Sequence, residues 1–231
     1  MSAYVFAPAA VRSLPITNSK QQFAVHRIFC VGRNYAAHAR EMGRDPDREP
    51  PFFFMKPAAA LVVSNPSATI PYPPQTSNFH YEAELVVAIG KGGRDIPLAR
   101  ALEHVYGYAV GLDMTRRDIQ LQAREQGRPW EFGKSFALSA PIGPIYSVSQ
   151  VGFLEHATIQ LQVNGVTKQN SDISKLIWSV AECIAHLSTF DELTEGDLIM
   201  TGTPEGVGAV VPGDLMRVSI DGIGHIEVSV A

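Results

Sequence analysis

The spacing of apolar and polar positions predicts a chain with more strands than helices. Short apolar runs bounded by glycine, proline or polar residues are typical of strands. Two longer stretches carry the tight-turn pairs Asn164-Gly165 and Asp221-Gly222, which predict β-hairpins. Strands are expected within 4–16, 24–32, 51–57, 60–64, 82–90, 134–146, 157–169, 197–208 and 214–230.

Helical patterns are fewer. Asn34 is a possible N-cap and Gly43 a possible end for the first helix. Since strands outnumber helices and often follow one another directly, the fold class is α+β rather than a regular β-α-β succession. Helices are expected in 34–43, in the first part of 96–113, in 114–127 and in 174–190, and a proline-rich loop in 65–78.

Composition excludes several classes of protein. The chain has 231 residues, 45% hydrophobic and 18% charged, which suits one domain with a sizeable core. A net charge of −4 argues against nucleic-acid binding. Two cysteines without a CxxC pair favour a reduced, cytoplasmic setting. We expect no membrane partner, because there is no signal-peptide pattern and no apolar run of about 18 residues.

Two carboxylates open the apolar strand at 85–89. Glu82 and Glu84 lie two residues apart, and alternate residues of a strand point to the same face. Asp113 ends another apolar strand, where an unpaired carboxylate is costly. The three carboxylates could hold a hard divalent cation such as Mg²⁺, which would relieve their repulsion. Alternatively, the glutamates are solvated and the aspartate caps the next helix.

The helix expected after Asp113 carries polar residues on one face. Arg117, Gln120 and Arg124 follow Asp113 at helical spacing. Such a face suits an anionic ligand held beside a metal. The alternative is an ordinary solvent-exposed face with a weak ion pair.

Further candidates lie in short motifs. His38 and Glu41 are three residues apart on the first helix, and a carboxylate beside a histidine is typical of a general base, although a surface pair is the alternative. Lys134 could stabilise an enolate or be an ordinary loop lysine. Thr203 lies in a glycine-rich loop that can bind oxygens. That loop lacks the Lys-Ser/Thr ending of a nucleotide-binding P-loop.

Several motifs together resemble the fumarylacetoacetate hydrolase family. They are CVGRNYAAHAREMG, FFFMKP, NFHYEAELVVAIG, GLDMTRRDIQ, RPWEFGKSF and TGTPEGVG, in the order and spacing of the short family members. The resemblance implies a mixed β-roll of several sheets with few short helices, a homodimer, and bound Mg²⁺ or Mn²⁺. It also implies a single catalytic domain over 1–231, with 1–25 as a short N-terminal extension.

The resemblance also implies roles for individual residues. The short helix matches the family's mobile lid, and Lys56 lies in a family motif without an assigned role. The implied metal ligands are Glu82, Glu84 and Asp113; the implied catalytic residues are His38, Glu41 and Lys134; the implied substrate-binding residues are Arg33, Arg117, Gln120 and Thr203.

The implied reaction is metal-dependent hydrolysis of a C–C bond in a 2,4-diketo acid, with pyruvate as one product. The motifs GRPWEFGKSF and REPPFFFMKPA favour the members that cleave fumarylpyruvate in gentisate breakdown, although Ala137 departs from the acidic residue expected in that subgroup. Acylpyruvate hydrolysis, oxaloacetate decarboxylation and enol–keto isomerisation use the same family site. A non-catalytic binder of small carboxylates is the alternative from another class.

Overall fold

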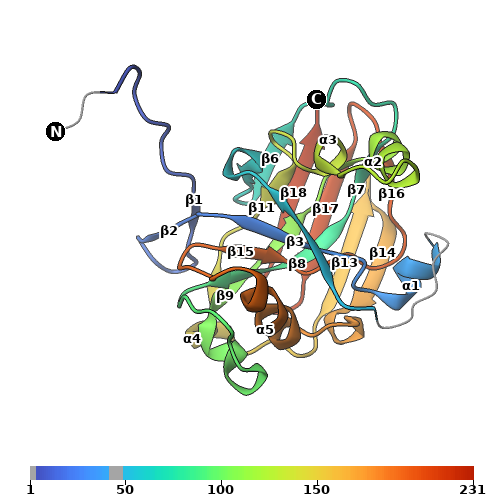
Figure 1. The fold of residues 1–231 in the computed structure, drawn as a ribbon. Coiled ribbons are helices and arrows are strands. Elements are labelled where there is room, and N and C mark those ends of the chain that lie inside the picture. The colour runs from blue at the N-terminus through green and yellow to red at the C-terminus, as the bar shows by residue number, and fades with distance from the viewer. Residues whose placement is uncertain (1–3, 42–48) are drawn as a thin grey trace.

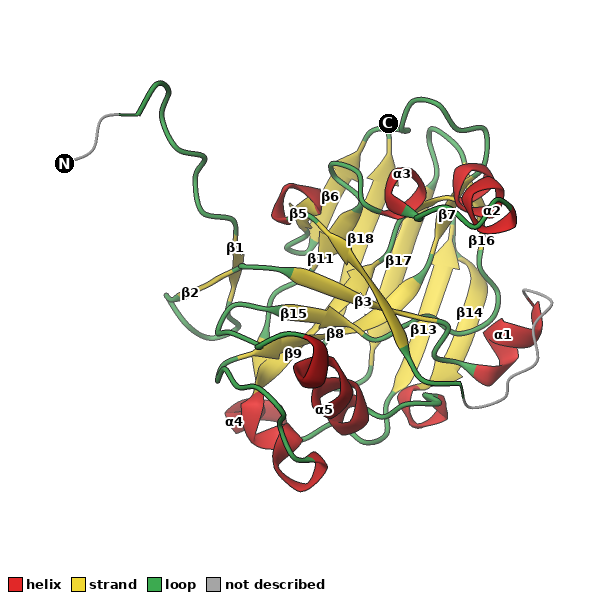
Figure 2. Cartoon of the chain, viewed as in Figure 1, coloured by secondary structure: helices red, strands yellow, loops and turns green. Residues whose placement is uncertain are grey.

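A large mixed sheet forms the centre of the protein in the computed structural model, which describes residues 4–41 and 49–231 (Figures 1 and 2). Its strand order is β4-β3-β15-β8-β9-β11-β5, and β12 also pairs with β9. The strands are β3 Ile28–Gly32, β4 Phe52–Lys56, β5 Leu61–Val63, β8 Ala83–Ile89, β9 Val105–Leu112, β11 Ala140–Ile142, β12 Tyr146–Ser147 and β15 Leu198–Met200.

A second sheet of five strands shares a hydrophobic core with the large sheet. Its order is β14-β13-β17-β18-β6. Both predicted hairpins lie here, and Asn164 and Gly165 have φ values of 51° and 79°, as a tight two-residue turn requires. The strands are β6 Ser67–Ile70, β13 Thr158–Val163, β14 Val166–Asp172, β17 Leu215–Ile220 and β18 His225–Val230.

Strand β8 is apolar throughout because both of its faces are buried. Leu85 and Val87 face the core shared with the second sheet. Val86 and Ala88 belong to a separate cluster that includes the hairpin of β1 (Ser13–Pro15) and β2 (Gln22–Ala24). A strand covered on both sides needs a continuous apolar run rather than an alternating one. By alternation, the residue at 84 shares the face of Val86.

Short elements surround these sheets. Helices α2 and α3 lie together at one end of the molecule in Figure 1, and α1 lies beside β14. No helix of residues 4–41 and 49–231 is long and apolar enough to span a membrane. The small sheet has β7 Phe79–Tyr81, β10 Thr115–Arg116 and β16 Gly208–Val210; the helices are α1 Ala36–Glu41, α2 Arg117–Glu125, α3 Glu131–Lys134, α4 Val148–Val151 and α5 Val180–Phe190, with 3₁₀ turns Ala58–Ala60, Leu98–His104 and Ile173–Lys175.

The predicted fold class is confirmed, with mixed sheets and few short helices. Some segments differ from the sequence-based expectation, and two of them have a clear physical reason. Segment 65–78 was expected to be a loop but contains β6, because its backbone pairs in parallel with β18. The helix expected over 174–190 begins at Val180, because Ser179 and Glu182 form a capping box there.

Asn34 does not cap α1 as expected. Its amide nitrogen donates to the carbonyls of Trp178 and Thr201, both at 2.9 Å, and its amide oxygen accepts from the Trp178 backbone N–H at 2.7 Å. Asn34 therefore joins the segment before α1 to the glycine-rich loop after β15. The predicted end of this helix, Gly43, lies outside the described residues.

Candidate active site

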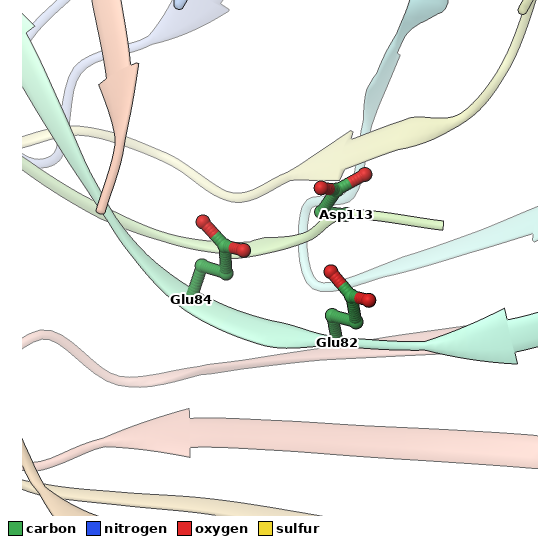
Figure 3. A group of neighbouring side chains, drawn as sticks. All are labelled: Glu82, Glu84 and Asp113. Carbon is green, nitrogen blue, oxygen red and sulfur yellow. The ribbon is translucent and has the colours of Figure 1, made fainter. Parts of the chain in front are cut away.

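Three carboxylates meet where β7, β8 and β9 join, and we call them the carboxylate trio: Glu82, Glu84 and Asp113. Glu82 is the residue between β7 and β8, Glu84 belongs to β8, and Asp113 follows β9. The Asp113 backbone N–H donates to the Glu82 carbonyl at 2.9 Å, so these residues oppose each other. One oxygen from each carboxylate lies within 4.8 Å of the others. Figure 3 shows the three side chains gathered on one side of the strand pair.

Three buried cationic side chains lie around the trio, and they are called the buried cations below: Lys56, Lys134 and Arg117. The Lys134 Nζ lies 2.6 Å from Glu82 Oε2 and 2.7 Å from Asp113 Oδ2. Arg117 donates to Glu82 Oε1, and the Lys56 Nζ lies 2.8 Å from Asp113 Oδ1. Burial alone would raise the pKa of Glu82, but Lys134 and Arg117 hold the pKa well below its ordinary value.

Glu84 differs from the other two carboxylates, because no cation among the described residues pairs with it. Its Oε2 accepts from the Gly202 backbone N–H at 2.8 Å. Burial, followed by repulsion from Asp113 and Glu82, raises the pKa of Glu84 well above its ordinary value. The trio thus has an uneven charge balance, with its deficit of positive charge at Glu84.

The trio fits a hard divalent cation. Carboxylate oxygens are the preferred protein ligands of Mg²⁺ and Mn²⁺. Besides the unpaired Glu84, Oδ1 of Asp113 has no hydrogen-bond donor among the described residues, because Lys56 forms an ion pair with this oxygen without hydrogen-bond geometry. A divalent ion between these oxygens would supply the missing positive charge and favour the ionised form of Glu84.

One cavity brings together nearly all the residues predicted from the sequence. Glu41 is the exception, because it lies outside the lining and contacts it through His38. The predicted residues that line the cavity are Arg33, His38, Glu82, Glu84, Asp113, Arg117, Gln120, Arg124, Lys134 and Thr203.

His38 and Glu41 form the predicted pair on α1. The His38 Nδ1 lies 3.2 Å from Glu41 Oε2, and His38 is buried whereas Glu41 is exposed. The Gly206 backbone N–H donates to the Glu41 carboxylate at 3.2 Å. When the histidine donates from Nδ1, its Nε2 is left as a proton acceptor. The role of α1 as a mobile lid stays a prediction, and residues 42–48 lie outside the described residues.

The polar face of α2 contacts the cavity rather than bulk solvent. Arg117 and Gln120 are buried, and the Arg117 guanidinium donates to Gln120 Oε1 at 2.5 Å. The weak surface ion pair considered as the alternative is therefore wrong for Arg117. Arg124, one turn further along, also lines the cavity.

Sequence reasoning missed several supporting groups. Lys56 had no assigned role, yet its Nζ also donates to Ser139 Oγ at 2.9 Å. The aromatic side of the site was also missed: the Trp130 ring lies 5.3 Å from Phe52 and 5.9 Å from Phe54. The sequence does carry a signal for this aromatic cluster, because alternation along FFFMK places these two phenylalanines on one face of β4.

We predict that Glu84→Gln weakens Mn²⁺ binding more than about 100-fold, because even residues that only orient ligands contribute about 10- to 100-fold. The glutamine keeps an oxygen for the Gly202 N–H, so the fold should survive. The measurement is Mn²⁺ titration by calorimetry, with the shift in thermal unfolding caused by Mn²⁺ as a second readout.

The matched control is Glu103→Gln, which removes an exposed glutamate that pairs with Arg100 and does not line the cavity. It should bind Mn²⁺ as the wild type does. Equal stabilisation of the Glu84→Gln and wild-type proteins by Mn²⁺ would contradict the assignment of Glu84.

Comparison with known proteins places the chain among catalytic relatives. The family described as Fumarylacetoacetate (FAA) hydrolase C-terminal matches residues 27–231. A fumarylpyruvate hydrolase from Ralstonia sp. is 52% identical over 191 residues, covering 82% of this chain and 98% of that protein. The mitochondrial oxaloacetate decarboxylase of Dictyostelium discoideum is 39% identical over 197 residues, covering 85% of this chain and 89% of that protein.

A solved structure agrees with these sequence relatives. The crystal structure of fumarylpyruvate hydrolase from Pseudomonas aeruginosa in complex with Mn²⁺ and pyruvate superposes with a TM-score of 0.98. It has 62% sequence identity, and the match covers 99% of each chain. The chain belongs to the fumarylacetoacetate hydrolase family.

Proposed function

We propose that this protein hydrolyses a carbon–carbon bond of a 2,4-diketo acid, with fumarylpyruvate as substrate and fumarate and pyruvate as products. The observation that carries the proposal is a single cavity lined by a buried carboxylate trio, a buried lysine and a histidine paired with a glutamate. Two fumarylpyruvate hydrolases are 52% and 62% identical to the chain, and one was solved with Mn²⁺ and pyruvate. The cofactor is Mg²⁺ or Mn²⁺.

Charge balance favours an anionic substrate. The three buried cations equal the three carboxylates in number, although none of them pairs with Glu84. A divalent ion would therefore leave the surroundings of the trio with two excess positive charges. A buried excess charge is costly unless it is paired. A 2,4-diketo acid brings a carboxylate and an enol oxygen that becomes anionic when the enol loses its proton, and these two charges match the excess.

The roles of the residues nearest the metal follow from their charge. Glu82, Glu84 and Asp113 would hold the cation, which supplies Lewis-acid polarisation of a keto oxygen when bound. Burial alone would lower the pKa of Lys134, but Asp113 and Glu82 raise this pKa above its ordinary value. Lys134 therefore remains positively charged and stabilises negative charge that develops on the pyruvate half of the substrate.

His38 and Glu41 prepare the attacking water. The Nε2 of His38 takes a proton from water, and the water oxygen bonds to the acyl carbonyl carbon. The bond from that carbon to the pyruvate half then breaks, and its electron pair remains on the pyruvate half as an enolate. A proton returns to the enolate carbon, giving pyruvate, while the acyl half leaves as fumarate.

Two arginines are available for the second carboxylate of fumarylpyruvate. Arg117 is already bonded to Glu82 and Gln120. Arg33 and Arg124 also line the cavity, and within residues 4–41 and 49–231 neither guanidinium has an ion-pair or hydrogen-bond partner. The Arg33 guanidinium lies over the Phe52 ring at 5.0 Å. We assign the distal carboxylate to Arg33 and Arg124.

Oxaloacetate decarboxylation is the second candidate, because a relative with that activity is 39% identical. Decarboxylation needs a stabilised enolate but no attacking water. The pairing of buried His38 with Glu41 therefore favours hydrolysis.

The proposal also includes the setting of the reaction. The enzyme acts in gentisate breakdown, is located in the cytoplasm and forms a homodimer.

The direct test follows the loss of the enol absorbance of fumarylpyruvate, with products identified by NMR. We expect turnover to fumarate and pyruvate that EDTA abolishes and Mn²⁺ or Mg²⁺ restores. His38→Asn should slow this hydrolysis by about 100- to 10,000-fold, the usual contribution of a general base.

The same His38→Asn protein, loaded with Mn²⁺, provides the internal control. It should bind pyruvate as the wild type does and keep any oxaloacetate decarboxylation, since that reaction needs no water activation. Hydrolysis unaffected by the substitution would exclude His38 as the base. Faster turnover of oxaloacetate than of fumarylpyruvate by the wild type would favour the second candidate.

For the distal carboxylate, we predict that Arg124→Met and Arg33→Met each lower kcat/KM for fumarylpyruvate by about 10- to 100-fold, the usual cost of losing a charged hydrogen bond. Acetylpyruvate lacks the distal carboxylate, so its kcat/KM should change less than about threefold. Arg100→Met, on an exposed arginine, is the matched control. Parallel losses for both substrates would refute a carboxylate-specific role.

A further inference from the structure

Gln169 is a buried side chain that links two parts of the site. It lies on β14, in the second sheet, with 1% of its surface exposed. Its Oε1 accepts from the Ala83 backbone N–H at 3.0 Å, and Ala83 lies between the two glutamates of the carboxylate trio. Its Nε2 donates to Thr203 Oγ1 at 2.9 Å and to the Pro204 carbonyl at 2.8 Å. One amide thus joins the metal-binding strand to the glycine-rich loop.

The orientation of this amide is fixed at both ends. A backbone N–H can only donate, so the Ala83 end requires the Gln169 oxygen. A backbone carbonyl can only accept, so the Pro204 end requires the Gln169 nitrogen. Reversing the amide would place oxygen against oxygen at one end and N–H against N–H at the other. Gln169 is therefore an obligate donor to Thr203.

The fixed amide determines what the Thr203 hydroxyl can offer a ligand. A hydroxyl has one hydrogen to donate and two lone pairs. The Gln169 N–H occupies a lone pair of Thr203 Oγ1. Within the described parts of the chain, the hydroxyl hydrogen has no acceptor. Because Thr203 lines the cavity and is 3% exposed, this hydrogen is available to a bound ligand.

The glycine-rich loop is held firmly against β14 at this point. Gly206 has a φ of 90°, and a Cβ at this position would collide with the Lys168 carbonyl, next to Gln169. The loop therefore lies directly on the strand that carries the glutamine. Moving the loop away from Gln169 would break this packing.

We propose that Gln169 is a positioning residue that makes the Thr203 hydroxyl a hydrogen-bond donor to an oxygen of the ligand that can only accept, the ionised carboxylate of pyruvate. The identity of the ligand rests on the proposed function, whereas the donor direction rests on the amide geometry. Gln169 does not touch the ligand itself, and its effect on binding passes through Thr203.

A double-mutant cycle tests this dependence. Calorimetry measures the binding of pyruvate to the Mn²⁺-loaded wild-type, Gln169→Met, Thr203→Val and doubly substituted proteins. Each single change should weaken pyruvate binding by about tenfold, as expected for a lost hydrogen bond to a charged group. The double change should also weaken it by about tenfold rather than a hundredfold, because both remove the same interaction.

Controls separate this role from a structural one. Gln162→Leu removes an amide on neighbouring β13 that donates to Gln160, and it should leave pyruvate binding unchanged. Mn²⁺ affinity should stay the same in all variants. Three results would each overturn the proposal. They are a roughly hundredfold loss of pyruvate affinity in the double variant, unchanged pyruvate binding in Gln169→Met, and a parallel loss of Mn²⁺ affinity.

A second measurement leaves Gln169 in place, so that the proposal can be tested even if the Gln169→Met protein does not fold. Thr203→Ser keeps the hydroxyl and should bind pyruvate within about twofold of the wild type, whereas Thr203→Val should not. Equal binding by these two variants would overturn the proposal. Because the readout is pyruvate binding, a protein that fails to hydrolyse fumarylpyruvate would refute the proposed function without deciding this test.

Discussion

The site depends on the neutralisation of three carboxylates that the fold holds away from water. Placing such groups together in a buried position is costly unless each anion is paired. Lys134 and Arg117 offset Glu82, and Lys134 and Lys56 offset Asp113. Glu84 has only the Gly202 N–H, so the arrangement is completed by a divalent cation. The excess positive charge that this cation brings is then a binding site for an anionic substrate.

The fold imposes this arrangement through its backbone rather than through flexible side chains. The register of β8 with β9 sets Ala83 opposite Leu112 and Glu84 opposite Gly111. The next pair in this register places Glu82 opposite Asp113. Slipping of β8 is costly because a shift of one residue would turn the Glu84 carboxylate into the apolar core that holds Leu85 and Val87. The spacing of the carboxylate trio is therefore set by the sheet.

The sequence predicted the parts of this site that depend on periodicity. Alternation placed Glu82 and Glu84 on one face, helical spacing placed Arg117 and Gln120 together, and resemblance to the family joined these segments. The sequence could not reveal Gln169, because its partners Ala83 and Thr203 lie 86 and 34 residues away along the chain. Such partners become neighbours only when the second sheet packs against the first.

Local signals were misread where tertiary pairing determines the structure. The prolines of 65–78 suggested a loop, yet four residues there join β18 as β6. Asn34 has the chemistry of a helix cap, but its amide bridges Trp178 and Thr201 instead. In both cases the hydrogen-bond partner is a backbone group far away along the chain, and a local sequence pattern cannot identify such a partner.

The most direct test of this account is the affinity of pyruvate for the protein with and without Mn²⁺, measured by calorimetry in a metal-free background. If the cation supplies the excess positive charge that holds the anion, Mn²⁺ should tighten pyruvate binding by at least about tenfold, and pyruvate should tighten Mn²⁺ binding by the same factor. Equal pyruvate affinity in the presence and absence of Mn²⁺ would contradict the charge balance on which the account depends.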